Sequence, residues 1–283
     1  MDKLMRGKTI ADKITESAIV EVNELKKKGK CVKLSIIRVG ANPDDMAYER
    51  GAVNRCKKIG IHVECIELPE DVSQEQYINL IEWLNDDKDV NGILTLRPLP
   101  NHIDENLVKD IINPLKDVDG FNPISFSKIA NADDSGFAPC TPSAVIEIIK
   151  ENGIELKGKH VVVVGRSMIV GKPLSMMLLN EDATVTVCHS KTKDLESITS
   201  KADILITAIG RAKMIDKYYV EKGVTVIDVG INVDDDGNLC GDVDIDDVLE
   251  IVDKITPVPG GVGSITTSVL ARNVIKAYKL QHK

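Results

Sequence analysis

The chain has 283 residues, of which 43% are hydrophobic and 28% charged, so it can bury sizeable cores beneath a charged surface. Its length suggests about two domains. The formal net charge of −8 and the absence of a basic run argue against a nucleic-acid-binding protein, which needs a basic footprint. Only 3% of the residues are aromatic, so the cores must be aliphatic, as is typical of parallel α/β sheets.

The first residues, MDKLMRGKTIADKI, lack the apolar segment of a signal peptide, and no run of 18 apolar residues follows. We therefore expect a cytoplasmic protein that does not span a membrane. The cysteines show neither C-x-x-C pairs nor zinc-ligand spacing, so we expect buried, reduced thiols and no metal site. They are Cys31, Cys56, Cys65, Cys140, Cys188 and Cys240.

The first part of the chain alternates segments of helical period with short segments of β character. The expected elements are a helix over 9–28, a strand over 32–39, a helix over 45–59, a strand over 61–68, a helix over 73–85 and a strand over 92–96. Ser73 and Gln76 have the spacing of a capping box, which supports the start of the third helix. The alternation predicts a parallel sheet covered by helices on both faces.

Residues 113–142 contain Pro, Asp, Gly and Asn throughout and show little periodicity. Long irregular segments are uncommon unless they are functional, so we interpret this stretch as a functional connection between two domains. A second alternating block follows. Its expected elements are strands over 159–164, 183–188, 202–207 and 224–229, and helices over 172–179 and 268–281.

A glycine turn joins the strand over 159–164 to the helix over 172–179. It reads Gly165, Arg166, Ser167, Met168, Ile169, Val170 and Gly171. Such a turn lets the backbone approach a pyrophosphate, and the helix N-terminus adds unpaired N–H groups. The match to G-x-G-x-x-G is imperfect, because Ser167 stands at the second glycine and the last glycine is one residue late. An ordinary strand-to-helix turn stays possible, but the context favours dinucleotide binding.

The end of the next strand indicates which dinucleotide is bound. An NAD site usually carries Asp or Glu there to hold the ribose 2′-hydroxyl. Here the strand ends in Cys188-His189-Ser190-Lys191-Thr192, without a carboxylate. Arg166 and Lys191 are cationic and Ser190 is a hydrogen-bond donor, which suits a 2′-phosphate. NADP is therefore preferred over NAD, although these groups could simply be solvated.

Several further stretches stand out, and each alone reads as turn chemistry. They are GILTLRPLP at 92–100, KDVDGF at 116–121, PCTP at 139–142, VIDVGIN at 226–232 and TPVPGGVG at 256–263. Together with GRSMIVGKP and CHSKT, and in this order, they closely resemble the methylenetetrahydrofolate dehydrogenase/methenyltetrahydrofolate cyclohydrolase family. The resemblance covers nearly the whole chain.

The resemblance implies an α/β fold of two domains. Residues 1–140, completed by the C-terminal helix at 268–283, would bind folate, and residues 141–267 would form a Rossmann-like NADP-binding domain. Members are usually homodimers that pair through the cofactor domain. The family oxidises 5,10-methylenetetrahydrofolate by hydride transfer to NADP and then hydrolyses the methenyl product to 10-formyltetrahydrofolate. Tetrahydrofolate derivatives are thus the expected substrates.

The resemblance also implies site residues. Those matching cofactor contacts are Gly165, Arg166, Ser167, Ser190 and Ile231. Those matching the folate site are Tyr48, Asp119, Pro259, Gly260 and Gly261. Asp119 matches the acid that holds the pterin ring, and Tyr48 matches a tyrosine near the reacting carbon, so both are expected catalytic residues. The PGGVG loop would lie near the nicotinamide and the pterin.

The chain departs from the family at two positions. Ala52 stands where the family has the lysine chiefly responsible for the cyclohydrolase step, and Leu96 stands where it has the glutamine that tunes that lysine. Alanine has no ionisable group for acid–base work. Arg55 is the best-placed substitute on the same helix, yet arginine does not readily release a proton. We expect Arg55 to be solvated or to face a phosphate.

The sequence therefore predicts a dehydrogenase with weak or absent cyclohydrolase activity. One alternative keeps both activities, with Arg55 or a water replacing the lysine. A second is a catalytically silent paralogue that binds NADP or folate. A third is a generic NADP dehydrogenase for a small acid, but none of the five histidines stands in a pattern that suggests catalysis.

Overall fold

The computed structural model describes residues 2–283, which form two compact units. The first unit comprises Asp12–Cys140 with Thr267–Lys283, and the second comprises Met1–Ala11 with Thr141–Thr266. Helix α1 (Lys8–Lys27) begins in the second unit and continues in the first. The sequence analysis had placed the N-terminal residues in the first unit. They join the second because Met5 donates its N–H to the carbonyl of Ile255 at 2.8 Å.

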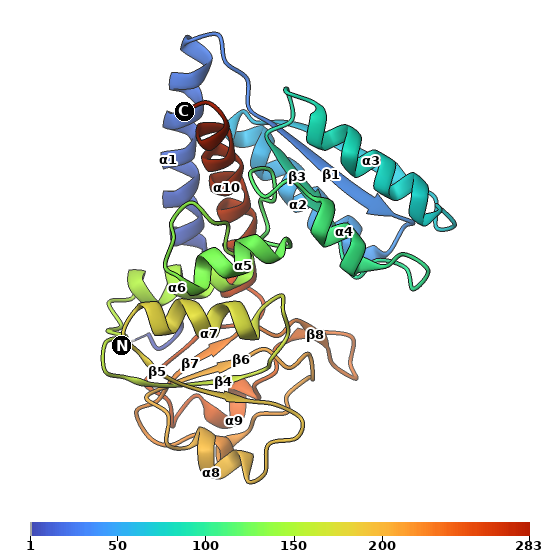
Figure 1. Ribbon diagram of the computed structural model, residues 1–283. Helices are drawn as coiled ribbons and strands as arrows, with labels where there is room; N and C mark the ends of the chain where they lie inside the picture. Colours follow the sequence, from blue (N-terminus) through green and yellow to red (C-terminus); the bar gives the residue numbers. More distant parts are fainter. Residues whose placement is uncertain (1) are drawn as a thin grey trace. The chain divides into compact units, whose positions relative to one another are not determined.

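The first unit is built on a three-stranded parallel sheet in the order β2-β1-β3. Its strands are β1 (Lys33–Val39), β2 (His62–Leu68) and β3 (Gly92–Thr95), and its helices include α2 (Pro43–Ile59), α3 (Gln74–Asp86) and α4 (Glu105–Ile111). Figure 1 shows α3 and α4 lying along the sheet. Their apolar faces share a core with Ile37 and Ile93 of the strands.

Local signals define the helices of this unit. The Asn42 side chain accepts the Asp44 N–H at the start of α2, Pro43 occupies the first turn, and Gly60 ends the helix in the left-handed conformation. Ser73 and Gln76 form the expected capping box of α3. The last helix, α10 (Thr266–Gln281), lies beside α1, where Lys279 is paired with Glu21 at 2.5 Å.

The stretch expected to be irregular contains helices. Residues 123–130 form α5 (Pro123–Ala130), and α6 (Cys140–Glu151) begins inside the stretch. The prediction of an irregular connection was therefore wrong in part. The reason is local, because the Asn122 side chain accepts the Ile124 N–H and Pro123 fits the first turn. Buried Ser125 and Ile129 then anchor the short helix.

The second unit is built on a five-stranded parallel sheet in the order β10-β7-β6-β4-β5. The strands are β4 (His160–Val164), β5 (Thr184–Cys188), β6 (Ile204–Thr207), β7 (Thr225–Asp228) and β10 (Lys254–Ile255). A short antiparallel hairpin pairs β8 (Asn232–Val233) with β9 (Leu239–Cys240). Besides most of α6, the helices are α7 (Gly171–Asn180), α8 (Leu195–Thr199) and α9 (Ile245–Val248), with 3-10 turns at Lys217–Tyr219 and Val262–Ser264.

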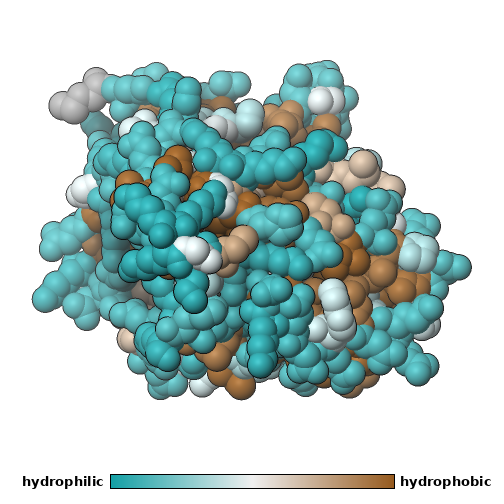
Figure 2. All heavy atoms as spheres, turned by 90° about the horizontal axis from the view of Figure 1, so that it is seen from above, coloured by the Kyte–Doolittle hydropathy of each residue, from teal (hydrophilic) through white to brown (hydrophobic). Residues whose placement is uncertain are grey.

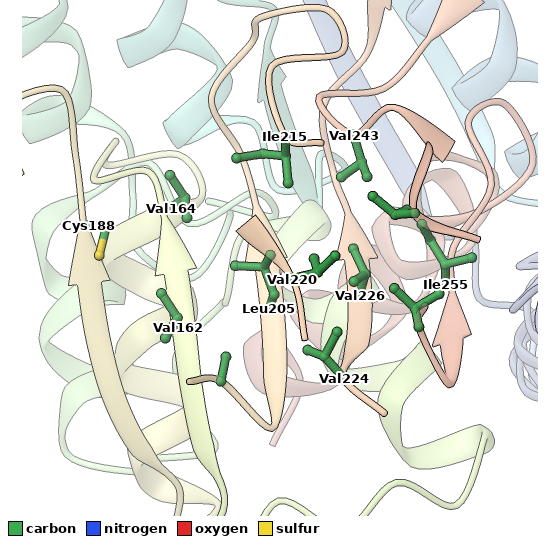
Figure 3. Close-up of a cluster of buried hydrophobic side chains, with 13 residues drawn as sticks. Val162, Val164, Cys188, Leu205, Ile215, Val220, Val224, Val226, Val243 and Ile255 are labelled. Atoms are coloured by element: carbon green, nitrogen blue, oxygen red, sulfur yellow. The ribbon is translucent and has the colours of Figure 1, made fainter. Parts of the chain in front are cut away.

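Valine and isoleucine fill the core of this unit, as the low aromatic content predicts. Figure 3 shows side chains from neighbouring strands, among them Val162, Leu205 and Val226, meeting on one face of the sheet. All three are fully buried. Figure 2 shows a surface on which hydrophilic side chains cover most of the area and hydrophobic ones appear between them.

Two sequence expectations concern the cysteines and the membrane. All six thiols are unpaired within residues 2–283, and four are buried, but Cys31 and Cys65 are exposed, so the prediction of buried thiols was wrong for these two. Cys65 lies on β2, an edge strand of the sheet, and is therefore covered less. Across the same residues, no helix is both long and apolar enough to cross a membrane.

Candidate functional site

The turn after β4 is built around two glycines that tolerate no side chain. Gly165 has a φ of 139°, and a Cβ there would lie 2.4 Å from the Ala208 carbonyl oxygen. A Cβ on Gly171 would lie 2.1 Å from the Gly165 carbonyl oxygen. The backbone of the turn therefore passes close to the loop after β6 and to the start of α7. This close approach explains why glycine is required at both positions.

Ser167 stabilises the turn from within, at the position where the G-x-G-x-x-G pattern has its second glycine. Its hydroxyl accepts the N–H of Val170 at 3.1 Å, and its carbonyl accepts the N–H of Lys172 at 3.0 Å. Helix α7 has no side-chain cap at its N-terminus. The N–H groups of Lys172 and Leu174 instead donate to the carbonyls of Ser167 and Val170, both at 3.0 Å. The positive end of the helix dipole still favours a bound anion at this place.

The charge around this turn is positive. Arg166 and Ser167 are exposed on the turn, and Ser190 and Lys191 are exposed after β5. The two loops are neighbours, because the Gly165 N–H donates to the carbonyl of Cys188 at 2.9 Å. The structure thus brings the loop of Arg166 beside the loop that carries Ser190 and Lys191.

A pocket of about 280 Å³ opens at the ends of β7 and β10. It is lined by residues 228–231 and by the loop at 257–264, so that Ile231 and the predicted Pro259, Gly260 and Gly261 share it. Ile231 is 65% exposed, which is unusual for an isoleucine and suits a contact with a flat ring. A Cβ on Gly261 would lie 2.6 Å from the Pro257 carbonyl oxygen, so the loop is tightly folded.

Two buried aspartates hold the loops around this pocket, and the sequence analysis missed both. Asp228 accepts the N–H groups of Asp242 and Val243 at 3.0 and 2.9 Å. Asp242 accepts those of Ile209 and Arg211 at 2.6 and 2.9 Å. Burial raises the pKa of Asp228 to about 6. The motif VIDVGIN contained the signal for Asp228, but no local pattern indicated the partner loops.

These features fit a dinucleotide. The glycines leave room for a pyrophosphate at the N-terminus of α7, and Arg166 and Lys191 offer cations for a further phosphate. The pocket beside Ile231 offers an apolar wall for a ring.

The predicted folate residues of the first unit lie near the carboxyl ends of its strands. Tyr48 and Ala52 are on α2, which follows β1, with Tyr48 half-buried and Ala52 fully buried. Arg38, at 5% exposure, ties α2 to the sheet by pairing with Glu49 and Glu67, each at 3.0 Å. Sequence reasoning missed this buried arginine, because a charge inside a strand shows no partner in the sequence.

Arg55 was expected to be solvated, but its side chain has hydrogen-bond partners. Its Nη1 donates to the hydroxyl of Thr15 on α1 at 2.9 Å, and its Nε donates to that of Thr267 at 3.5 Å. Arg55 therefore fastens α2 to α1 and to the first turn of α10. The expectation of a solvated charge was wrong, because the threonines of α1 and α10 supply acceptors. The alternative, that Arg55 faces a phosphate, stays a prediction.

Leu96 and Asp119 flank the end of β3. Leu96 is 6% exposed and continues the sheet by donating its N–H to the carbonyl of Ile37 at 3.0 Å. Asp119 is partly exposed, and its Oδ1 accepts the N–H of Cys140 at 2.9 Å. Asp117 forms an isolated parallel β-bridge with Ile93, so the KDVDGF segment runs beside β3. The structure thus brings the segment of Asp119 next to β3, which Leu96 follows.

Family models match both units. Residues 5–119 match the catalytic domain of tetrahydrofolate dehydrogenase/cyclohydrolase, and residues 139–282 match its NAD(P)-binding domain. The chain belongs to the tetrahydrofolate dehydrogenase/cyclohydrolase family. The resemblance inferred from the motifs is confirmed, and so is the two-domain α/β fold.

Individual relatives agree with this assignment. A protein of Clostridioides difficile named "Bifunctional protein FolD" is 58% identical over 280 residues, which cover 99% of this chain and 98% of the relative. The solved structure of the bifunctional FolD from Campylobacter jejuni is similar, with a TM-score of 0.95 and 42% identity over 98% of each chain. The Trypanosoma brucei dehydrogenase-cyclohydrolase, solved with NADP and an inhibitor, gives a TM-score of 0.94 at 35% identity over 99% of this chain and 98% of that one.

Most of the range matched by the NAD(P)-binding domain lies in the second unit, and most of the range matched by the catalytic domain lies in the first. The turn at 165–171 and the residues after β5 form one group, and Ile231 with the PGGVG loop forms another. Tyr48 and Ala52 lie on α2, Leu96 follows β3, and Asp119 lies between α4 and α5. The structure also shows no group of three or more His, Cys, Asp or Glu residues arranged for a metal within residues 2–283.

Proposed function

We propose that this protein oxidises 5,10-methylenetetrahydrofolate to 5,10-methenyltetrahydrofolate with NADP as the hydride acceptor, and that its cyclohydrolase step is weak or absent. The observation that carries the proposal is the pairing of a complete dinucleotide turn with an apolar Ala52 and Leu96 on the catalytic domain. Family membership supports the substrate class.

The oxidation asks the protein mainly to align two rings. The lone pair of a folate nitrogen drives the hydride away from the methylene carbon, and bound NADP supplies the nicotinamide that accepts it. Asp119 would hold the pterin ring, and Tyr48 would pack near the reacting carbon. Gly165, Ser167 and the N-terminus of α7 would hold the pyrophosphate. Holding reactants in this way can supply several kcal/mol of the barrier reduction.

The hydrolysis also requires an acid–base group, because adding water to the methenyl carbon involves proton transfer. Ala52 and Leu96 are buried and apolar, so neither can accept or donate a proton. Arg55 is engaged with Thr15 and Thr267, and its guanidinium stays protonated. These three observations support loss of the second step.

A second candidate keeps both activities. The names of several relatives favour it, because the C. difficile and C. jejuni proteins are called bifunctional. In that case a bound water or another side chain would replace the missing lysine. Another protein would not be needed to hydrolyse the methenyl product.

One assay separates the candidates. The purified chain is mixed with 5,10-methylenetetrahydrofolate and NADP, and NADPH and methenyl-folate are followed together by absorbance. We expect NADPH to rise while methenyl-folate accumulates. Methenyl-folate consumed as fast as it forms would establish both activities, and no NADPH at all would indicate a silent paralogue.

The preference for NADP over NAD is tested separately. Arg166 is exposed beside the turn and next to the loop of Lys191. We expect Arg166→Ser to raise the KM for NADP about tenfold and to change the KM for NAD by less than about twofold, because a charge-assisted contact to the 2′-phosphate is lost. Lys222→Ser, an exposed cation elsewhere in the second unit, serves as the control. Equal rises for both cofactors would refute the assignment of Arg166.

A homodimer formed through the cofactor domain is also proposed from the family resemblance. Strand β5 supports it, because it is an edge strand of the five-stranded sheet and Val187 on it is 39% exposed. Light scattering coupled to size-exclusion chromatography would report a mass of twice 30.9 kDa for the dimer.

A further inference from the structure

Arg97 lies two residues after the end of β3, in largely buried surroundings. Its side chain is only 10% exposed, although arginine is rarely buried without partners. The guanidinium carbon lies 4.1 Å from the centroid of the Phe121 ring. Its Nη2 lies 3.5 Å from Oδ2 of Asp119. Both partners belong to the KDVDGF segment, so Arg97 links the end of β3 to that segment.

Asp119 is therefore held from two sides. Its Oδ1 accepts the main-chain N–H of Cys140 at 2.9 Å, while its Oδ2 faces Arg97. The longer contact is an ion pair at the limit of hydrogen-bond distance, so Oδ2 keeps lone pairs for another donor. Because each oxygen has a partner, the two contacts favour one orientation of the carboxylate about its Cβ–Cγ bond.

Phe121 makes the position of Arg97 precise. The main-chain N–H of Phe121 donates to Asp117 Oδ1 at 2.8 Å, and this hydrogen bond restrains the backbone that carries the ring. A planar guanidinium stacked on an aromatic ring loses orientational freedom. Lysine could supply the charge in this place but not the stack.

We propose that Arg97 is a positioning residue of the folate site, which holds the Asp119 carboxylate in the orientation that accepts the N–H donors of the pterin ring. This inference rests on the proposed function, in which Asp119 binds the pterin. Arg97 acts through Asp119 and does not itself contact the substrate.

A double-mutant cycle tests this role. Binding of tetrahydrofolate to the full chain is measured by titration calorimetry for the wild type, Arg97→Met, Asp119→Asn and the double variant. We expect Arg97→Met to weaken binding about tenfold in the wild-type background and by less than about twofold in the Asp119→Asn background, because the shared interaction is already lost. NADP binding should stay within about twofold. Arg6→Met, an exposed arginine of the second unit, is the matched control.

If Asp119→Asn binds tetrahydrofolate too weakly for calorimetry, variants of Arg97 alone provide the test. Arg97→Lys keeps the charge but loses the stack on Phe121, so it should lose about threefold, whereas Arg97→Gln loses both and should lose about tenfold. Thermal unfolding verifies that each variant folds. Equal losses for Arg97→Lys and Arg97→Gln, or equal effects of Arg97→Met in both backgrounds, would overturn the inference. A wild-type chain that binds tetrahydrofolate but forms no NADPH would contradict the proposed function instead.

Discussion

Charged residues within the KDVDGF segment have different tasks, although they stand side by side. Lys116 is 5% exposed and donates to the carbonyls of Leu84, Asn85 and Asp87, where it ends α3. Asp117 is 1% exposed and caps the following turn. Asp119 alone of these three is partly exposed. The motif therefore combines two structural charges with one that can meet a ligand.

The apolar pair Ala52 and Leu96 leads to a prediction of gained activity. We expect the double variant Ala52→Lys with Leu96→Gln to hydrolyse methenyl-folate at least about tenfold faster than the wild type, because general acid–base catalysis contributes roughly 10²–10⁴-fold when a group is well placed. Loss of methenyl absorbance over the spontaneous rate measures this.

Each single variant and the uncharged Ala52→Met with Leu96→Gln serve as controls. These should stay near the wild-type rate, because a lysine alone lacks its tuning partner and methionine has no ionisable group. A wild-type chain that already hydrolyses methenyl-folate rapidly would refute the interpretation of both positions.

At the scale of the element, the turn between β4 and α7 determines cofactor binding. Ala at position 165 would need an unfavourable φ of 139° and a displaced Ala208 carbonyl. We expect Gly165→Ala to raise the KM for NADP by more than about tenfold, since the backbone would move away from the pyrophosphate. The KM is measured by the rate of NADPH formation at saturating folate.

Gly223 provides a matched control in the same unit. It has a φ of +93°, yet a Cβ there meets nothing within 4 Å. Gly223→Ala should therefore lose about 1–2 kcal/mol of stability and leave the KM for NADP unchanged. A similar KM for both variants would show that the turn is not the cofactor contact.

Elements of the first unit are joined by charges rather than by apolar contacts alone. Arg38 connects β1 to α2 and β2, and Arg55 connects α2 to α1 and α10. Helix α2, which carries Tyr48 and Ala52, is thus fastened on two sides. Its geometry depends on partners that come from distant parts of the sequence.

At the scale of the whole molecule, each unit contains one buried aspartate with a raised pKa. Burial raises the pKa of Asp117 in the first unit and of Asp228 in the second to about 6. Both groups hold a proton in the folded chain between about pH 4 and 6, where unfolded carboxyls are ionised. Their contribution to the unfolding free energy is therefore full below about pH 4 and falls as the pH rises through 6.

We expect this loss to amount to about 1–3 kcal/mol for each group between pH 4 and 7. Carboxyl ¹³C resonances of labelled aspartate should show two titrations with midpoints near pH 6. Asp117→Asn and Asp228→Asn should each remove one of them and assign it. Midpoints below about pH 5 for every aspartate would contradict the prediction.

The fold class followed from the sequence because its signals are local. Periodicity located most helices and strands, as in α1 and β4, and the capping box of Ser73 marked the start of α3. The short helix α5 was missed because its length of eight residues gives little periodicity and its proline reads equally as a turn.

The sequence by itself determined the family, the two α/β blocks and the glycine turn, because motif order and hydrophobic period are properties of neighbouring residues. Only the tertiary structure decided the partners of buried charges. Arg97 stacks on Phe121, Arg55 donates to Thr15, and Asp242 accepts from Ile209. These pairs are 24 to 40 positions apart in the chain, where no local pattern indicates a partner. A buried charge without a partner costs free energy, so each must be paired. The tertiary fold decides which residue becomes its partner.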